Sequence, residues 1–595
     1  MKDNKNKVLQ FGNEAIAHGA REAGCYYAVA YPGTPSSEIL SVFSKLPGIF
    51  AKWSPNEKVA LEVGIGASLA GSRTLCTMKH VGVNVAMDPL MTFTYTGVVG
   101  GFVLVSADDP GMHSSQNEQD NRILAKFAKM PCFDPADSQE AHDFTKLAFE
   151  VSERFNAPVM LRETTRIAHA KGLVELGEWK DPVRGDAFER DTQRFVMMPN
   201  FARPRHTFAE NRALELAKFS DEWEGNELTL NSKKIGIITG GIAAQYVKEL
   251  MPDASFLKVG MPWPFPAEKA KKLAEHCDMV LVVEELEPFL EEEAKIIGIQ
   301  CEGKKFFPRE GELNLDIVSA GLKKAGVYDG EVLVGDVASV IARPPVLCAG
   351  CPHRGIYMAL KKVNADVYGD IGCYTLAALQ PLETLHTCFC MGASIGNTIG
   401  SSMAAKDSKH PQVAIIGDGT FMHSGITGLM DAVTSGTDIT VVIVDNSITA
   451  MTGGQQNPAT GYDLMGNVVP KVQLEKICES LGVEKVTVLD SYNFDNAVEE
   501  LKKSIEFKGV SVLIARHECM LFPNKQRPNP YMVNDDCNGC GACFRIGCPA
   551  IADSGEKTAK GLTIATIDPA ACTGCTLCVQ VCKPNAIEQL VSEEA

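Results

Sequence analysis

Ile416-Gly-Asp-Gly-Thr420 and, further along, Ile439-Thr-Val-Val-Ile-Val-Asp-Asn446 decide the fold of this chain. The apolar runs 413–416 and 439–444 have the character of buried strands, and 425–433 between them has helical spacing. The stretch therefore predicts one strand–helix–strand unit of a parallel sheet.

Polar residues follow both predicted strands. Gly417 and Gly419 let the backbone turn tightly and approach a ligand, while Asp418 and Asn446 end their strands at the carboxyl edge, where α/β sheets bind ligands. Two side-chain oxygens and the backbone carbonyl of Ile448 would make half an octahedron for Mg²⁺, leaving positions for diphosphate oxygens and water. The pattern resembles the diphosphate fingerprint of thiamine diphosphate enzymes; the alternative is an ordinary Asp-Gly turn.

Composition narrows the function classes. At 595 residues the chain should hold about four domains, and its net charge of -17 argues against nucleic acid and anionic lipid as partners. The start is too polar for a signal peptide, and the most apolar window, 91–107, is too short and too broken to span a bilayer. We expect a soluble cytoplasmic protein without membrane contact. Its twenty cysteines then favour metal ligands over disulfides.

The first predicted module covers residues 1–188. Strand-like segments alternate with helical ones, as in a parallel sheet covered on both faces. The polar loops 31–38 and 108–120 each follow a strand, where pockets form, although a simple turn and helix cap explains any single residue there.

A carboxylate begins the small-residue segment 56–71 of this module. Thiamine chemistry needs an acid that holds a proton on the aminopyrimidine ring, and the segment resembles the pyrimidine-binding module of that class, with Glu57 as the catalytic acid. Glu62 is the alternative, and either residue could instead be a solvated helix charge. The spacing to Gly66 and Gly71 favours Glu57.

The middle of the chain carries weaker signals. Residues 189–230 are polar, Arg-rich and weakly periodic, which predicts a connecting segment. Residues 231–330 have α/β character and resemble the third, carboxy-terminal domain of transketolase-like enzymes. We expect a structural role for them, because the Gly240-Gly241 turn lacks a full phosphate-binding fingerprint. The diphosphate module is predicted at 340–525.

The tail, 530–595, contains two cysteine runs with the spacing of cubane iron–sulfur ligands. In two-cluster ferredoxins the fourth cysteine of each run binds the other cluster. The expected ligand sets are Cys537, Cys540, Cys543 and Cys582 for one [4Fe-4S] cluster, and Cys572, Cys575, Cys578 and Cys548 for the other. The first run has one extra residue before Cys548; structural zinc is the alternative.

Three further motifs carry a family resemblance over essentially the whole chain: Cys348-x-x-Cys351-Pro-His-Arg354, Asp370-Ile-Gly-Cys373-Tyr and Met391-Gly-Ala-Ser-Ile. The pattern resembles the 2-oxoacid:ferredoxin oxidoreductases and looks most like the large subunit of the indolepyruvate members. The implied architecture is a multi-domain α/β thiamine diphosphate enzyme: two parallel-sheet cofactor modules, a transketolase C-terminal-like domain and a C-terminal two-cluster ferredoxin-like domain.

The resemblance implies oxidative decarboxylation of aryl pyruvates to aryl-acetyl-CoA, with coenzyme A as co-substrate and ferredoxin as electron acceptor. It also implies a smaller second (beta) subunit and a hetero-oligomer. The alternatives are an oxidoreductase for another 2-oxoacid, a non-oxidative thiamine decarboxylase with an accessory tail, and a pure electron-transfer subunit. We place Thr34, His80 and His353 in the substrate pocket.

A third cluster is a separate expectation. Cys348, Cys351, Cys373 and Cys519 all fall at ends or turns of the predicted diphosphate module, and by resemblance they hold a [4Fe-4S] cluster beside thiamine. A one-electron oxidation needs an acceptor near the reacting carbon, which supports the assignment. Against it, free cysteines are commonly buried as small hydrophobic residues.

Overall fold

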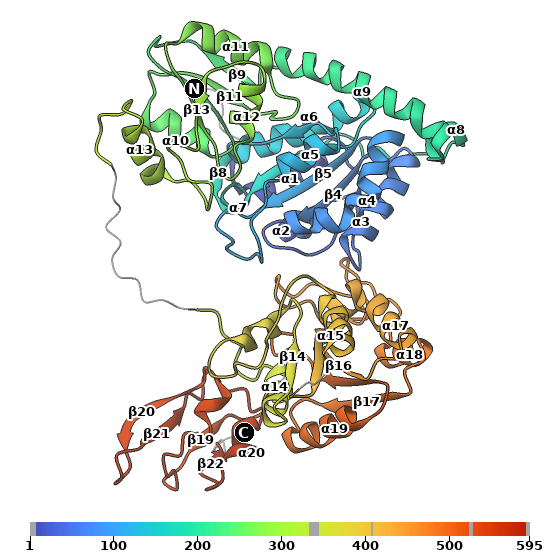
Figure 1. Cartoon of the computed structure of the whole chain (residues 1–595), viewed down its shortest axis with the longest axis vertical. Coiled ribbons are helices and arrows are strands. Elements are labelled where there is room, and N and C mark those ends of the chain that lie inside the picture. Colours follow the sequence, from blue (N-terminus) through green and yellow to red (C-terminus); the bar gives the residue numbers. More distant parts are fainter. Residues whose placement is uncertain (1–6, 333–343, 406–408, 523–526, 591–595) are drawn as a thin grey trace. The chain divides into compact units, whose positions relative to one another are not determined.

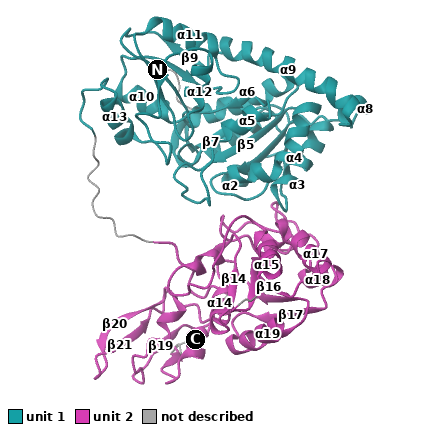
Figure 2. Ribbon diagram, in the orientation of Figure 1, with its two compact units in different colours: residues 1–340 teal, residues 341–595 magenta. Residues whose placement is uncertain are grey.

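The computed structural model describes residues 7–332, 344–405, 409–522 and 527–590. The chain divides into two compact units, 1–340 and 341–595 (Figures 1 and 2). The predicted module boundaries at 340 and 525, and both chain ends, lie outside the described residues. No helix within the described ranges is long and apolar enough to cross a membrane.

Unit 1 begins with a six-stranded parallel sheet of order β3-β2-β4-β5-β7-β6, as the alternating pattern predicted. Its strands are β2 (Tyr27–Ala30), β3 (Phe50–Trp53), β4 (Thr74–Lys79), β5 (Phe102–Asp108), β6 (Cys132–Phe133) and β7 (Val159–Thr164). Its helices are α1 (Gly12–Glu22), α2 (Ser37–Phe43), α3 (Glu57–Leu69), α4 (His80–Thr96), α5 (Asn121–Phe127), α6 (Ser138–Phe155) and α7 (Thr165–His169). An antiparallel pair, β1 (Lys7–Phe11) and β8 (Lys171–Glu175), was not anticipated.

A second sheet of unit 1 has five strands in the order β13-β12-β10-β11-β9, with only β9 antiparallel. The strands are β9 (Glu227–Thr229), β10 (Gly236–Gly240), β11 (Ser255–Val259), β12 (Val280–Val283) and β13 (Cys301–Glu302). The helices are α10 (Ala243–Leu250), α11 (Ala267–His276), α12 (Phe289–Ile296) and α13 (Leu315–Lys324). Buried Val, Leu and Ile residues on both faces of β10–β12 explain why these segments are apolar without alternation.

The segment between the two sheets, 189–230, is more ordered than a connection. It forms α8 (Thr192–Phe195), the 24-residue helix α9 (Pro199–Glu222) and edge strand β9. Arg212 of α9 is buried and donates to Thr94 O at 2.7 Å, and Arg205 donates to Tyr95 O at 2.8 Å. Arg205 and Arg212 therefore donate to backbone carbonyls at the end of α4. The apolar periodicity of a sequence does not reveal such contacts.

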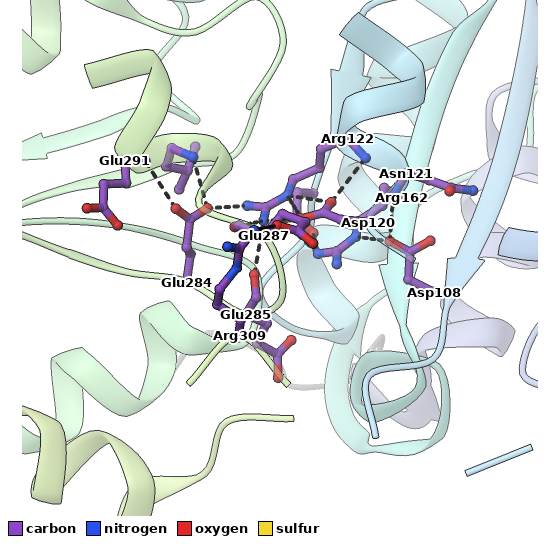
Figure 3. Close-up of polar contacts among 12 residues, drawn as sticks. Asp108, Asp120, Asn121, Arg122, Arg162, Glu284, Glu285, Glu287, Glu291 and Arg309 are labelled. Carbon is purple, nitrogen blue, oxygen red and sulfur yellow. Dashed lines mark hydrogen bonds and ion pairs between the residues drawn. The ribbon is translucent and has the colours of Figure 1, made fainter. Parts of the chain in front are cut away.

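A buried ion-pair network joins the two sheet-containing domains of unit 1 (Figure 3). Arg122 of α5 contacts Asp120 at 2.5 Å and Glu284, which follows β12, at 2.9 Å. Arg162 of β7 contacts Asp108 at 2.9 Å. Charges buried this deeply are stable only when paired, so separating the two domains would leave Arg122 and Glu284 without each other.

Unit 2 contains a five-stranded parallel sheet of order β14-β15-β16-β18-β17. The strands are β14 (Asp366–Tyr368), β15 (Gln412–Gly417), β16 (Ile439–Asp445), β17 (Lys485–Asp490) and β18 (Val510–Arg516). Its helices are α14 (His353–Lys362), η1 (Cys373–Ala378), α15 (Ala393–Ala404), α16 (Asp418–Thr420), η2 (Phe421–Gly425), α17 (Ile426–Thr434), α18 (Leu474–Ser480) and α19 (Phe494–Glu506). The predicted strand–helix–strand unit is confirmed as β15, α16–α17 and β16.

The tail of unit 2 is built from two short antiparallel pairs. These are β19 (Tyr531–Val533) with β22 (Ile587–Gln589), and β20 (Ile551–Lys557) with β21 (Thr563–Ile567); η3 (Phe544–Ile546) and α20 (Leu577–Val581) complete it. Gln580 of α20 donates to Tyr492 O at 2.7 Å and accepts from Phe494 N at 2.9 Å. The tail is therefore fixed to the start of α19.

Candidate functional site

The carboxyl edge of β15 and β16 gathers the predicted diphosphate residues. Gly417 pairs with Val444 in the sheet, so Asp418 and Asn446 leave adjacent strands side by side. Asp418 is 3% exposed and accepts a 3.0 Å hydrogen bond from Asn457 Nδ2. A Cβ at Gly419 would lie 3.1 Å from Thr449 Oγ1, which shows how closely the following loop covers this edge.

The electrostatics of this edge suit a hard cation. Burial raises the pKa of the Asp418 carboxyl, and the nearby Asp445 carboxylate raises it further. Asn446 Oδ1 accepts from Ile448 N at 3.3 Å, so the amide and the Ile448 backbone lie together. A buried carboxylate beside amide and carbonyl oxygens is the ligand chemistry that Mg²⁺ prefers, so the residues fit the predicted ion.

Glu57 and Glu62 occupy different environments on α3. Glu57 is the first helical residue, 6% exposed, and its carboxyl group packs so closely that a Cβ at Gly82 of α4 would meet it at 2.7 Å. Glu62 is exposed and pairs with Lys58 one turn earlier. Of the two, only Glu57 has the burial that a proton-holding acid requires, and Glu62 has the setting of a solvated helix charge.

The predicted substrate residues separate into two groups. In unit 1, Ser114 Oγ donates to Thr34 O at 3.2 Å, and Lys79 Nζ donates to Ser114 O at 2.6 Å. Both ring nitrogens of His80 face backbone carbonyls, with Nε2 3.2 Å from Asn117 O. Thr34 and His80 therefore both lie against the 108–120 loop.

His353 belongs to unit 2. Its Nε2 lies 3.3 Å from Asn446 Nδ2, and its ring packs edge-on against Tyr374. Burial lowers the pKa of His353 to about 4, so the imidazole is neutral. The structure thus places it with the diphosphate residues.

The eight tail cysteines surround two separate cavities. One is lined by Cys537, Cys540, Cys543 and Cys582, and the other by Cys548, Cys572, Cys575 and Cys578. Each cavity therefore combines three cysteines of one run with the last cysteine of the other. Four thiols around one cavity fit a cubane cluster. Cys548 lines the cavity of its expected ligand set despite the extra residue that precedes it in the sequence.

The other predicted cluster cysteines also approach one another. Burial, together with the nearby Cys519 and Cys348 thiols, raises the pKa of Cys373 to about 11. Cys351 N donates to Cys348 O at 3.0 Å, and Cys519 N donates to Asn446 O at 3.1 Å. The four cysteines thus lie in one region of unit 2, directly beside a predicted Mg²⁺ ligand.

Three residues at these sites were not identified from the sequence. Asn457 donates to Asp418, and Tyr492 contacts both Gly350, in the Cys348–Cys351 loop, and Gln580 of the tail. Arg354 donates to the carbonyl of Cys348 and to the carbonyl of Ile546 in the tail. Arg354 stands inside the Cys-Pro-His-Arg motif, which is a usable signal. Asn457 and Tyr492 lie in loops with no distinguishing pattern.

Family models match three parts of the chain. Residues 18–216 match the thiamine-diphosphate-binding domain of pyruvate flavodoxin/ferredoxin oxidoreductase, and 370–515 match the C-terminal binding domain of thiamine pyrophosphate enzymes. Residues 522–586 match a 4Fe-4S dicluster domain. The chain thus has thiamine-diphosphate-binding and [4Fe-4S]-binding domains.

Full-length relatives agree with this order of domains. The indolepyruvate oxidoreductase subunit IorA of Archaeoglobus fulgidus is 40% identical over 98% of this chain and 97% of its own length. Those of Pyrococcus abyssi and Methanothermobacter thermautotrophicus are 39% and 38% identical, each over 98% of this chain and 97% of the relative. The chain therefore belongs to the IorA family of indolepyruvate oxidoreductase subunits, within the 2-oxoacid:ferredoxin oxidoreductases.

Proposed function

We propose that this chain is the large subunit of an enzyme that oxidatively decarboxylates aryl pyruvates such as indolepyruvate. The products are aryl-acetyl-CoA, carbon dioxide and two reduced ferredoxins, because each 2-oxoacid gives up two electrons that ferredoxin accepts singly. The aryl pyruvate class follows from the names of the relatives. Coenzyme A, ferredoxin and a smaller second subunit complete the proposal.

The observation that carries it is a continuous set of contacts within unit 2. Cys519 N donates to Asn446 O, which ties the four-cysteine region to the diphosphate edge. Tyr492 Oη lies 3.1 Å from Sδ of Met520, the residue after Cys519, and 2.5 Å from Gly350 O, and Gln580 of the tail donates to Tyr492 O. These contacts pack the tail against the diphosphate-binding domain, which an electron-transferring enzyme needs and a non-oxidative decarboxylase does not.

We assign roles to the residues of the cofactor site as follows. Asp418, Asn446 and the Ile448 carbonyl hold Mg²⁺ against the diphosphate, with Gly417 and Gly419 allowing close approach. Glu57 holds the proton on the aminopyrimidine ring. Thiamine diphosphate, when bound, supplies the carbon nucleophile and electron sink that decarboxylation requires. Thr34, His80 and neutral His353 contact the substrate.

We further propose three [4Fe-4S] clusters per chain, the third held by Cys348, Cys351, Cys373 and Cys519. Anaerobically purified protein should contain about twelve iron atoms per chain, three cubanes of four. Cys373→Ser should lower this to about eight while the two tail clusters keep their spectra. Eight irons in the unaltered protein would contradict the third cluster.

The function itself is tested by supplying each reactant separately. The complex with its second subunit should reduce ferredoxin only when an aryl pyruvate and coenzyme A are both present. Carbon dioxide release that is unaffected by omitting the electron acceptor would indicate a non-oxidative decarboxylase. Faster turnover of 2-oxoglutarate or pyruvate would indicate another 2-oxoacid, and the native mass of the complex would test the second subunit.

A further inference from the structure

Arg354, in the first turn of α14, connects two cysteine loops. Its side chain is 2% exposed. Nη2 donates to Leu347 O at 2.8 Å and to Cys348 O at 3.0 Å, while Nη1 donates to Ile546 O at 2.8 Å and to Gly547 O at 2.7 Å. One guanidinium therefore joins the loop of Cys348 to the residues immediately before Cys548.

The two loops also touch directly. Gly350 lies between Cys348 and Cys351 with a positive φ of 62°, and a Cβ there would collide with Thr573 Oγ1. Thr573 follows Cys572 in the second tail run. The contact requires glycine, so the loop of the proposed third cluster and the loop of a tail cluster are packed without space for a side chain between them.

Arg354 lines the cavity formed by Cys548, Cys572, Cys575 and Cys578. Its buried Nε has no hydrogen-bond partner among the described residues, and neither has Thr573 Oγ1, which lines the same cavity. Buried donors are normally satisfied, and a cubane in this cavity would offer sulfur acceptors to both. The cavity thus offers a cluster two hydrogen-bond donors in addition to its four cysteine thiols.

Among the residues that the structure describes, no side chain neutralises the charge of Arg354. No carboxylate in the part of the chain that the structure describes forms an ion pair with it, since its partners are four neutral carbonyls. Its guanidinium lies between the two cysteine loops, because it lines the cavity of Cys548, Cys572, Cys575 and Cys578 and donates to the carbonyl of Cys348. In a poorly solvated site such a cation favours the state with one more electron.

We propose that Arg354 is a positioning residue that raises the reduction potential of the tail cluster held by Cys548, Cys572, Cys575 and Cys578. Its four carbonyl contacts also hold that cluster against the Cys348–Cys351 loop. This rests on the proposed function, in which electrons pass from the thiamine site to the tail. The raised potential makes this tail cluster the better acceptor for electrons that leave the Cys348 side.

The test is a potentiometric titration of the anaerobically purified holoenzyme, followed by electron paramagnetic resonance, with iron analysis. Arg354→Gln should hold the same iron as the unaltered enzyme but bind the electron at this cluster at least tenfold more weakly, a drop of about 59 mV for one electron. Arg354→Lys, which keeps the charge, should stay within threefold. Arg545→Gln is the matched control, because it removes an exposed arginine three residues from Cys548 and should change nothing.

Unchanged potentials in a fully loaded Arg354→Gln enzyme would overturn the inference. If Arg354→Gln does not retain its iron, Arg354→Met provides the second neutral variant; failure of both, with Arg354→Lys intact, would show a folding role instead and would also overturn it. The proposed function fails separately, if the unaltered enzyme lacks the third cluster or does not reduce ferredoxin with an aryl pyruvate.

Discussion

Arg122 in unit 1 and Arg354 in unit 2 are both fully buried where two domains of a unit meet, but their charges have different partners. Arg122 lies between the carboxylates of Asp120 and Glu284 (Figure 3). Arg354 contacts carbonyl oxygens and lines a cavity. The first charge is neutralised by carboxylates of the protein, whereas the second remains available to a bound group.

Asp418 extends the comparison to negative charge. It is as deeply buried as Asp120, yet the side chain that contacts its carboxylate is the Asn457 amide rather than an arginine. Burial without a counter-charge is unfavourable in the free protein, so such a residue is better suited to a ligand than to stability. Removing buried charges from unit 2 should therefore affect cofactors, and removing them from unit 1 should affect stability.

The largest expected effect is at Asp418. Asp418→Ala should abolish Mg²⁺-dependent retention of thiamine diphosphate, because a methyl group cannot replace a hard oxygen ligand. Iron content should stay unchanged and the melting temperature should not fall. Cofactor analysis and calorimetry measure these, with the exposed Asp431→Ala as control. Normal retention of thiamine diphosphate would remove Asp418 from the site.

Glu57 should be the exception in unit 1, a buried charge whose loss affects chemistry. Glu57→Gln should bind thiamine diphosphate yet slow deprotonation of its reactive carbon by about 10²- to 10⁴-fold. Hydrogen–deuterium exchange at that carbon measures the step. Glu62→Gln, which changes an exposed residue of the same helix, should exchange at the normal rate; the reverse result would show that Glu62 is the acid.

Arg122 should show the opposite behaviour to Arg354. Arg122→Met leaves Asp120 and Glu284 buried without a cation, which should lower the free energy of unfolding of unit 1 by about 3–5 kcal/mol. Denaturant titration measures this, while the iron content and cluster potentials should not change. Arg309→Met removes an exposed arginine paired with Glu287 and should leave the free energy of unfolding almost unchanged. Equal losses in the two variants would contradict the assignment.

The smallest expected effect is a pH dependence at Glu285, next to the Arg122 network. Burial raises the pKa of Glu285 to about 7, only partly offset by a hydrogen bond from Leu313 N and by Arg162, while Asp134 and Glu312 add to the rise. Because the folded pKa exceeds the unfolded one, the folded state binds more protons between about pH 4.5 and 7. The contribution of Glu285 to the free energy of unfolding of unit 1 is thus fully present at low pH and is lost as the pH rises through 7.

Glu285→Gln should remove that loss, so the variant should gain about 1–3 kcal/mol over the unaltered protein at pH 8 and little at pH 4.5. Melting temperatures of both proteins across this range measure the difference. Glu287→Gln, at a more exposed neighbour, should follow the unaltered protein at every pH. A gain that is independent of pH would mean that Glu285 does not titrate in this range.

The sequence was most informative where adjacent residues carry the chemistry. The apolar run that ends at Gly417 predicted β15, but the tight turn expected at Gly417 and Gly419 is instead the start of helix α16; the doubled cysteine runs predicted which four thiols line each tail cavity. It was least informative at 189–230, because the partners of Arg205 and Arg212 are carbonyls of α4 more than a hundred residues away.

By itself, then, the sequence determined the α/β class, the thiamine and iron–sulfur modules and their order, because strand periodicity, glycine turns and cysteine spacing are local properties of the chain. Only the tertiary structure decided which of Glu57 and Glu62 is buried, and that Arg354 reaches Ile546, 192 residues further along. Such pairings depend on how distant segments pack, and packing determines which charges lose their water and which partners they meet instead.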